Sequence, residues 1–187
     1  RVASAHLSIM IRGKSQVFAG GPPVVKQALG LDIDKEALGG YDAMHRYSGV
    51  VGLAVDTEEE ALQATRRFLS YLPSHSGEMP PLAPVAPAGD APSLLDLVPE
   101  NRSRVYDMRK VIDAIMDPGS VFHLRERFGR TVVTALARLD GRSVGVIANN
   151  PVRLGGCLDS PSAEKAARFV RMCDAFGVPP VVVVDVP

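Results

Sequence analysis

The chain of 187 residues has no tryptophan and no excess of charge of either sign, because 21 basic residues balance 21 acidic ones. A neutral chain without a basic cluster argues against a protein that binds nucleic acid. Uninterrupted apolar runs are also short, and none has the roughly 20 residues that a membrane-spanning helix needs. The first residues lack the apolar segment of a secretory signal. We therefore expect neither a nucleic-acid nor a membrane partner.

Cysteine and histidine are scarce as well. The only two cysteines, Cys157 and Cys173, form no Cys-x-x-Cys pair, so a secreted disulfide framework is excluded and a reducing compartment is the expectation. The four histidines lie far apart in the sequence and lack the spacing of metal ligands, and we predict no metal site.

What the chain does have is enough apolar sequence for a core, with 46% hydrophobic residues. Residues 6–11 and 181–186 both read as strands placed almost at the ends of the chain. A natural domain seldom begins and stops on a strand in this way, so the chain is interpreted as a fragment. A proline-rich stretch at residues 73–99 divides it into two regions, because such a stretch cannot be helical inside.

The first region is expected to be mixed α and β. Residues 6–11 and 16–19 are predicted as strands around the turn Arg12-Gly13-Lys14, and residues 50–55 as another strand. A short helix is predicted over residues 24–29. Thr57-Glu58-Glu59-Glu60 has the pattern of a capping box and opens a longer helix that runs to about residue 71. Its apolar stripe is Ala61, Ala64, Phe68 and Leu72.

In the second region, the residue pattern predicts a helix over residues 106–116, with an apolar face of Val111, Ile112, Ile115 and Met116. Residues 131–139 and 143–148 are β-branched and apolar, and Asp140-Gly141 between them is a strong hairpin signal, since both turn residues need positive φ.

A loop at residues 149–159 and a helix complete the second region. Ser160 is expected as the N-cap and Pro161 as the first helical residue, with Ala163, Ala166, Ala167, Val170 and Cys173 on the packed face. The apolar run at residues 181–186 reads as a strand buried on both faces. Strand, helix and strand make a βαβ unit with parallel strands. Ligands bind at the carboxyl ends of such strands, so the loop at residues 149–159 is the candidate site.

The candidate loop contains Gly155-Gly156 just before a helix N-terminus. Such glycines let a backbone approach a ligand, and their amides can stabilise an anion or an oxyanion. From the residues alone, a plain turn before a helix is the simpler explanation of the pair, since two adjacent glycines are a weak signal. Arg153 could pair with a phosphate or be a solvated loop residue, and Cys157 has no recognisable base to activate it. Asp185, at a strand end, is either catalytic or an anchor for the loop.

Several motifs, in order, resemble one family. They are Gly-Gly-Pro-Pro-Val-Val-Lys at 20–26, Leu-Gly-Gly at 38–40, Ser-Gly-Val at 48–50, Leu-Ser-Tyr-Leu-Pro at 69–73, Gly-Arg-Ser-Val-Gly-Val-Ile-Ala-Asn-Asn-Pro at 141–151, Gly-Cys-Leu-Asp at 156–159 and Cys-Asp-Ala-Phe at 173–176. The ordered set is similar to the carboxyltransferase (beta) subunits of biotin-dependent acyl-CoA carboxylases, which include the propionyl-CoA, methylcrotonyl-CoA and longer-chain acyl-CoA carboxylases.

The resemblance implies an α/β crotonase-like (ClpP/crotonase) fold. Residues 1–72 would be the C-terminal part of an N-terminal carboxyltransferase domain, residues 73–100 a linker, and residues 101–187 the start of a C-terminal carboxyltransferase domain. The implied activity moves a carboxyl group from carboxybiotin to the α carbon of an acyl-CoA. Biotin would be carried by a partner carrier domain, alongside a biotin carboxylase subunit, in a homo-oligomer that is hexameric in the family. The expected location is the cytoplasm, or the mitochondrial matrix in a eukaryote.

By the same resemblance, the backbone amides of Gly155, Gly156 and Cys157 are the catalytic candidates. Contacts to acyl-CoA or biotin are assigned to Asn149, Asn150, Pro151, Arg153 and Gly156. The family's two main oxyanion loops would lie outside residues 1–187, so the isolated fragment is expected to be inactive. Three positions depart from the family pattern: Met44 stands where histidine is usual, with His45 next to it, His123 stands where an acidic residue is common, and Asn150 replaces glutamine.

Two other interpretations remain open. One is the related biotin-linked acyl-CoA decarboxylase subunit of membrane sodium pumps, which runs similar chemistry toward biotin carboxylation. The other is a non-catalytic fragment that acts only in oligomer assembly.

Overall fold

The computed structural model describes residues 2–85, 93–101 and 104–186. The chain divides into two compact units, Arg1–Thr65 and Arg66–Pro187, which are described separately. The boundary lies inside helix α3 (Glu58–Leu69). The proposed limits of the carboxyltransferase domains, residues 72 and 101, remain predictions, and part of the expected linker lies outside the described residues.

The first unit contains a small parallel sheet. Strand β1 (Ile9–Ile11) pairs with β2 (Leu53–Val55), with Ile9 opposite Leu53 and Ile11 opposite Val55. A short 3-10 helix, η1 (Val2–Ser4), precedes β1. The prediction of a strand at residues 16–19 is wrong: that segment is irregular, and the Val17 amide donates to the Gly39 carbonyl at 2.8 Å. The partner of β1 comes from a distant part of the chain, which a local turn signal cannot indicate.

Helices make up most of the rest of the first unit. Helix α1 (Pro22–Leu29) ends at Gly30, which adopts φ 68° as expected for a helix stop. Two further elements were not predicted, α2 (Lys35–Gly39), capped by the Asp34 side chain, and η2 (Ala43–Tyr47), which is a π-helix.

The start of α3 confirms the predicted capping box. The Glu60 amide donates to Thr57 Oγ1 at 3.1 Å, and Glu60 Oε2 accepts from the amides of Thr57 at 3.4 Å and Asp56 at 2.8 Å. The two side chains thus satisfy backbone donors that the first helical turn leaves without partners.

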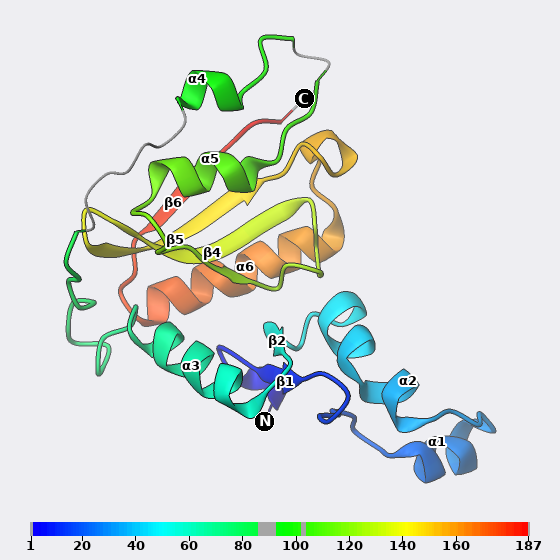
Figure 1. Ribbon diagram of the computed structural model, residues 1–187. Helices are drawn as coiled ribbons and strands as arrows, with labels where there is room; N and C mark the ends of the chain where they lie inside the picture. Colours follow the sequence, from blue (N-terminus) through cyan, green and yellow to red (C-terminus); the bar gives the residue numbers. More distant parts are fainter. Residues whose placement is uncertain (1, 86–92, 102–103, 187) are drawn as a thin grey trace. The chain divides into compact units, whose positions relative to one another are not determined.

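The second unit is built on a four-stranded sheet in the order β3-β4-β5-β6, of which β4, β5 and β6 are labelled in Figure 1. The strands are β3 (Phe122–Leu124), β4 (Val132–Leu139), β5 (Arg142–Asn149) and β6 (Pro180–Val183). The predicted hairpin is confirmed: β4 and β5 are antiparallel, and the turn residues Asp140 and Gly141 have φ 51° and 73°. The predicted parallel pairing of β5 with β6 is also confirmed.

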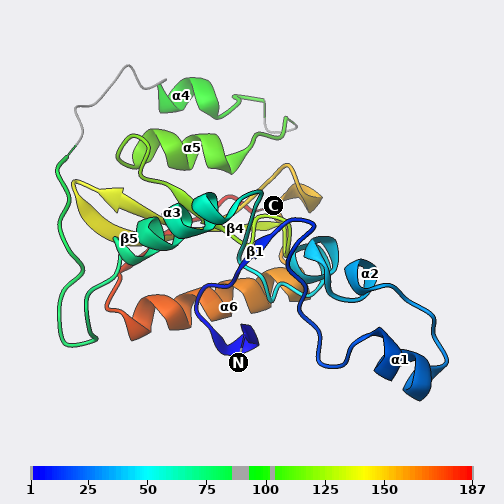
Figure 2. The ribbon, with the colours of Figure 1, turned by 60° about the horizontal axis from the view of Figure 1, so that its bottom comes forward.

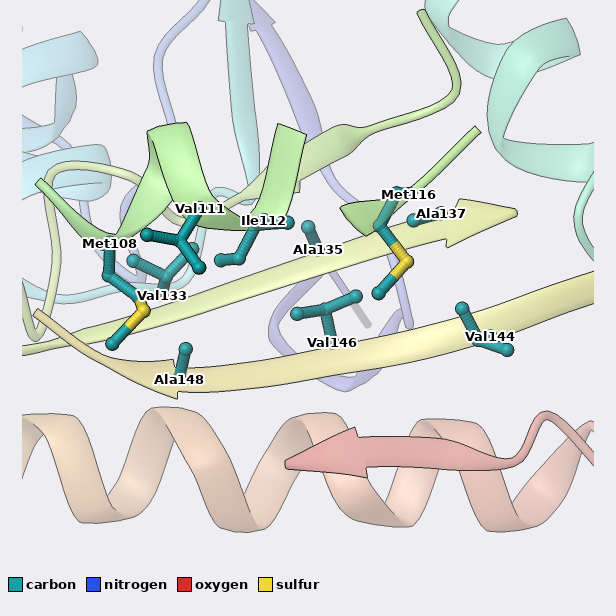
Figure 3. Close-up of a cluster of buried hydrophobic side chains, with 10 residues drawn as sticks. All are labelled: Met108, Val111, Ile112, Met116, Val133, Ala135, Ala137, Val144, Val146 and Ala148. Atoms are coloured by element: carbon teal, nitrogen blue, oxygen red, sulfur yellow. The ribbon is translucent and has the colours of Figure 1, made fainter. Parts of the chain in front are cut away.

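Helices cover both faces of this sheet (Figure 2). On one face lies α5 (Met108–Ile115), with the short α4 (Leu94–Leu97) against it. On the other lies α6 (Ser160–Ala175). The core between α5 and the sheet is shown in Figure 3. It uses alternate residues of β4 and β5, as a strand period of two requires, and consists of Met108, Val111, Ile112, Met116, Val133, Ala135, Ala137, Val144, Val146 and Ala148.

Helix α6 differs from its prediction in cap and in face. Its N-cap is Asp159, whose Oδ1 accepts from the Ser162 amide at 3.0 Å, and Ser160 is already helical. The predicted alanine face is largely exposed, and Val170 is 43% exposed. The residues that pack are Ser162, Lys165, Phe169, Met172 and Cys173. The sequence of this mostly polar helix offers more than one apolar stripe. The stripe that contains Phe169 and Met172 is the one that is buried in the structure.

Strand β6 was expected to be buried on both faces. In this structure it lies at one edge of the described sheet, and Val182 is 60% exposed. The regular strand also ends earlier than expected, at Val183.

Candidate functional site

The candidate loop leaves the carboxyl end of β5 and leads into α6. It contains a short 3-10 turn, η3 (Leu154–Gly156), in which three successive residues have positive φ: Leu154 at 49°, Gly155 at 61° and Gly156 at 84°. A left-handed backbone is costly for a residue with a side chain, and here it is sustained over a whole turn. The glycine pair is therefore required by the backbone path, as well as by any ligand.

The backbone amides of this turn divide into two kinds. The Gly156 amide donates to the Arg153 carbonyl at 2.9 Å, and the Cys157 amide donates to the Leu154 carbonyl at 3.1 Å. The Gly155 amide donates to no residue in the described part of the chain. A methyl group added at Gly155 would meet nothing within 4 Å, so the position is open. Of the three predicted catalytic amides, the structure leaves that of Gly155 available, while those of Gly156 and Cys157 hold the turn.

Gly156 lies inside the loop instead of on its surface. A Cβ at this position would lie 2.5 Å from Asn149 Nδ2 and 2.9 Å from the Asp185 carbonyl oxygen. Gly156 therefore has a packing role in the loop, and its predicted contact with a ligand remains a prediction. Bulky substitution here would therefore displace neighbouring backbone, beyond any direct effect on a ligand.

Asn149 and Asn150, predicted to contact acyl-CoA or biotin, are 6% and 4% exposed, and Pro151 is buried. The Asn149 side chain pairs with the main chain of Asp185, donating to its carbonyl and accepting from its amide at 2.6 Å. The Asn150 side chain donates to Asp107 Oδ1 at 3.1 Å and accepts from the Met108 amide at 3.3 Å. Both side chains thus support the loop from within the protein, and their predicted contacts with a ligand remain predictions.

The outer surface of the loop carries the remaining candidates. Arg153 and Cys157 are both exposed. Apolar side chains surround Gly155 in sequence, with Leu154 70% and Leu158 65% exposed. An available amide within exposed apolar surface suits the carbonyl group of a largely apolar ligand.

Two residues that support the loop were not predicted as such. The Tyr106 hydroxyl donates to Asp185 Oδ2 at 2.7 Å, and burial together with this carboxylate raises the pKa of Tyr106 to about 12. Asp107 is paired with Arg109 at 2.7 Å, which lowers the pKa of the Asp107 carboxyl. In the sequence these two residues stand at the start of the helix predicted over residues 106–116, and no local signal indicates their contacts with the distant Asp185 and Asn150. Asp185, for which two roles were open, accepts from Tyr106 and pairs with Asn149 through its main chain, which agrees with a role as an anchor for the loop.

His45 and His123, the histidines where the sequence departs from the family pattern, are buried and half-buried respectively. His45 is 5% exposed, its Nδ1 lies 3.0 Å from the Val51 carbonyl, and its ring stacks on Tyr41. His123 lies on β3, where burial lowers its pKa. Within the described ranges, no three His, Cys, Asp or Glu residues are grouped so that they could hold a metal ion. Nor does any described helix have the length and apolar character to cross a membrane.

The fold and the loop define a class. The fold is crotonase-like, with a strand, a glycine-containing loop and a helix that present a backbone amide at the carboxyl end of a strand. The family described as "Carboxyl transferase domain" matches residues 1–187, and the chain belongs to it.

Individual relatives sharpen the assignment. The chain is 42% identical over 187 residues to a propionyl-CoA carboxylase beta chain of Roseobacter denitrificans, covering 99% of this chain and 37% of the relative. It is 40% identical over 183 residues to methylmalonyl-CoA decarboxylase subunit alpha of Veillonella parvula, covering 95% and 35%. A crystal structure of transcarboxylase 12S, described as a hexamer, superposes with a TM-score of 0.92 at 36% identity, covering 99% and 37%. The chain thus spans somewhat over a third of these proteins. The resemblance to carboxyltransferase subunits of acyl-CoA carboxylases is confirmed.

Proposed function

We propose that this chain is a segment of the carboxyltransferase subunit of a biotin-dependent acyl-CoA carboxylase, which transfers a carboxyl group from carboxybiotin to the α carbon of an acyl-CoA. Family membership along the full chain carries the proposal. The available Gly155 amide supplies a chemical reason that this segment takes part.

Carboxyl transfer of this kind needs stabilisation of negative charge more than a side-chain nucleophile. The transfer exchanges two groups: the α carbon would lose its proton and gain the carboxyl group, and the ureido nitrogen that loses the carboxyl group would take the proton. Negative charge would develop on the thioester oxygen and on the ureido oxygen during this exchange, and a preorganised amide aimed at either oxygen stabilises it. Gly155 offers such a donor on a rigid turn, held by the Gly156 and Cys157 hydrogen bonds.

The biotin group, when present on its carrier, supplies the carboxyl group. The loop fits such a ligand, since it offers a hydrogen-bond donor without a partner among the described residues, open space above it and exposed apolar side chains beside it. The contribution of this chain is to hold the Gly155 amide in place and to present apolar surface around it. Arg153, exposed on the same loop, is a candidate partner for a phosphate of the acyl-CoA.

The partners follow from the proposed activity. They are an acyl-CoA, a biotin carboxylase subunit and a biotin carboxyl carrier, with a homo-oligomer of this subunit, by analogy with the hexamer of transcarboxylase 12S. The unpaired Cys157 and Cys173 are consistent with a reducing location, the cytoplasm or, in a eukaryote, the mitochondrial matrix.

A decarboxylase subunit is the second candidate, favoured by the 40% identity to the Veillonella protein. Such a subunit would use the same loop to transfer a carboxyl group from the acyl-CoA to biotin. The two functions differ in their partner: a carboxylase subunit is expected to assemble with a biotin carboxylase, and a decarboxylase subunit is not.

The test uses the complete subunit whose gene encodes this chain. Purified subunit is mixed with a carboxylated biotin carrier and with acetyl-, propionyl- or longer-chain acyl-CoA, and the carboxylated thioester is measured. The proposal expects product from at least one acyl-CoA. Failure with all of them, from a folded oligomer, would refute it. The isolated 187 residues are expected to give no product.

A further inference from the structure

Asn149 is the residue through which the strand and the candidate loop are held together. It is the last residue of β5, its side chain is buried, and it forms both hydrogen bonds that a carboxamide can direct at one residue's main chain. Its Nδ2 donates to the Asp185 carbonyl, and its Oδ1 accepts from the Asp185 amide at 2.6 Å. The amide side chain thereby extends the pairing of β5 with β6 beyond the last ladder residues, Ala148 and Val183.

The Asn149 side chain and the Asp185 main chain also form the surface against which the candidate loop packs. Gly156 lies so close that a Cβ would be 2.5 Å from Asn149 Nδ2 and 2.9 Å from the Asp185 carbonyl. Gly156 in turn donates to Arg153 and so closes the turn that carries Gly155. A displacement of Asn149 or of the Asp185 backbone is therefore transmitted through Gly156 to the Gly155 amide.

Further contacts hold this arrangement from the outside. Tyr106 donates to the Asp185 carboxylate at 2.7 Å. The adjacent Asn150 connects the strand end to the start of α5 through Met108 and Asp107. The end of β5 is thus held on both sides, and the Asn149–Asp185 pair is the part that contacts the glycine turn.

We propose that Asn149 is a positioning residue for carboxyl transfer, which sets the direction of the Gly155 amide through its two-point pairing with Asp185. This inference rests on the proposed function and deepens it. Asn149 touches no substrate in this account; it acts by fixing Gly156, and through Gly156 the donor.

Asn149→Asp offers a readout that simple destabilisation does not. A protonated carboxyl has one donor and one acceptor, like the amide it replaces, so it can donate to the Asp185 carbonyl and accept from the Asp185 amide. An ionised carboxylate has only acceptors and directs negative charge at the Asp185 carbonyl. The activity of this variant is therefore expected to rise, relative to wild type, as the pH falls.

The experiment measures kcat and KM of the complete subunit with carboxylated carrier and acyl-CoA. Asn149→Ala is expected to lower kcat roughly 10²-fold, the scale of a misplaced catalytic group, with KM for the acyl-CoA little changed. The ratio of kcat in Asn149→Asp to that in wild type is expected to increase as the pH falls through the titration of the new carboxyl, whose pKa is raised above the ordinary value of about 3.9 by burial and by the facing Asp185 carbonyl oxygen.

Val144→Ala is the matched control, since Val144 is buried at the opposite end of β5, in the core beneath α5. It is expected to lower the melting temperature and leave kcat unchanged. If Asn149→Ala also leaves kcat per folded subunit unchanged, or the kcat ratio of Asn149→Asp does not vary with pH, the inference is overturned. If the wild-type subunit itself transfers no carboxyl group, the proposed function fails instead, so the two failures are distinguishable.

Discussion

The contact of β5 with α6 leaves no room for a side chain at Gly145. A Cβ there would lie 2.5 Å from Cys173 Sγ and 3.1 Å from Phe169 Cε1. Both neighbours are only 1% exposed and cannot move into solvent. Burial also raises the pKa of the Cys173 thiol to about 11, so it stays neutral and behaves as a small apolar group. Gly145→Ala is therefore a test of overpacking at one defined point.

The magnitude follows from opposing effects. Carbon atoms in contact prefer about 3.5–4.0 Å, so the shortfall to Cys173 is about 1 Å, and overpacking of this kind costs about 1–3 kcal/mol. Replacing glycine within a strand returns about 0.5–1 kcal/mol. We expect a net loss of about 1–2 kcal/mol in the free energy of unfolding. Cys173→Ala alone should cost about 1 kcal/mol by leaving a small cavity.

The double variant Gly145→Ala/Cys173→Ala decides between packing and other causes. The new methyl group then occupies part of the space vacated by Sγ, so the double variant should be more stable than the sum of the single losses by about 1 kcal/mol. Denaturant unfolding of all four proteins gives this coupling. Cys157→Ala controls for cysteine removal at an exposed site and should be nearly neutral. Additive losses, or a neutral Gly145→Ala, would refute the packing argument.

Two further predictions concern charged groups of α6. Lys165 Nζ donates to the Val132 carbonyl at 2.7 Å, yet burial lowers its pKa from 10.5 to about 7. Because the unfolded chain holds this proton up to a higher pH than the folded chain, the free energy of unfolding should increase from pH 7 to pH 10.5, by at most about 5 kcal/mol. Lys165→Met should remove most of this increase when the free energy of unfolding is measured as a function of pH. Parallel curves for the wild type and the variant would contradict the prediction. Asp159→Ala removes the cap of α6 and should cost about 1 kcal/mol near neutral pH. Since hydrogen bonds from Ser162 lower the pKa of Asp159, the wild-type advantage should disappear as the pH falls through that pKa, and an advantage that persists in acid would argue against the cap.

Local rules predicted the elements that depend on neighbours in sequence. The Thr57–Glu60 capping box, the Asp140-Gly141 hairpin and the stop at Gly30 all arise from interactions spanning a few residues, and the structure confirms them. The pairing of β1 with β2 joins residues 9 and 53, and no signal within either segment indicates the other. The packed face of α6 was likewise decided by what the sheet offers, here the space beside Gly145 that Phe169 and Cys173 fill.

The candidate loop was located from sequence, but the roles within it were not. Its position follows from the order strand, loop, helix, strand, and Gly155 was among the named candidates. Which amides are already bonded depends on the turn geometry, where Arg153 and Leu154 accept from Gly156 and Cys157. Asn149 was assigned to ligand contact through the family resemblance, and no signal in the sequence indicated its hydrogen bonds to the distant backbone of Asp185.

Removal of the Gly155 N–H group tests most directly whether this amide stabilises the negative charge that develops during carboxyl transfer. Replacing Gly155 by glycolic acid converts that amide to an ester and leaves the side chain and chain length unchanged. We expect kcat for carboxyl transfer by the complete subunit to fall about 10²–10³-fold, the loss seen when one oxyanion donor is removed. The same ester at Gly177, whose amide donates to Asp174 at the end of α6, should leave kcat unchanged. Full activity with the ester at Gly155 would contradict the proposed role of the Gly155 amide.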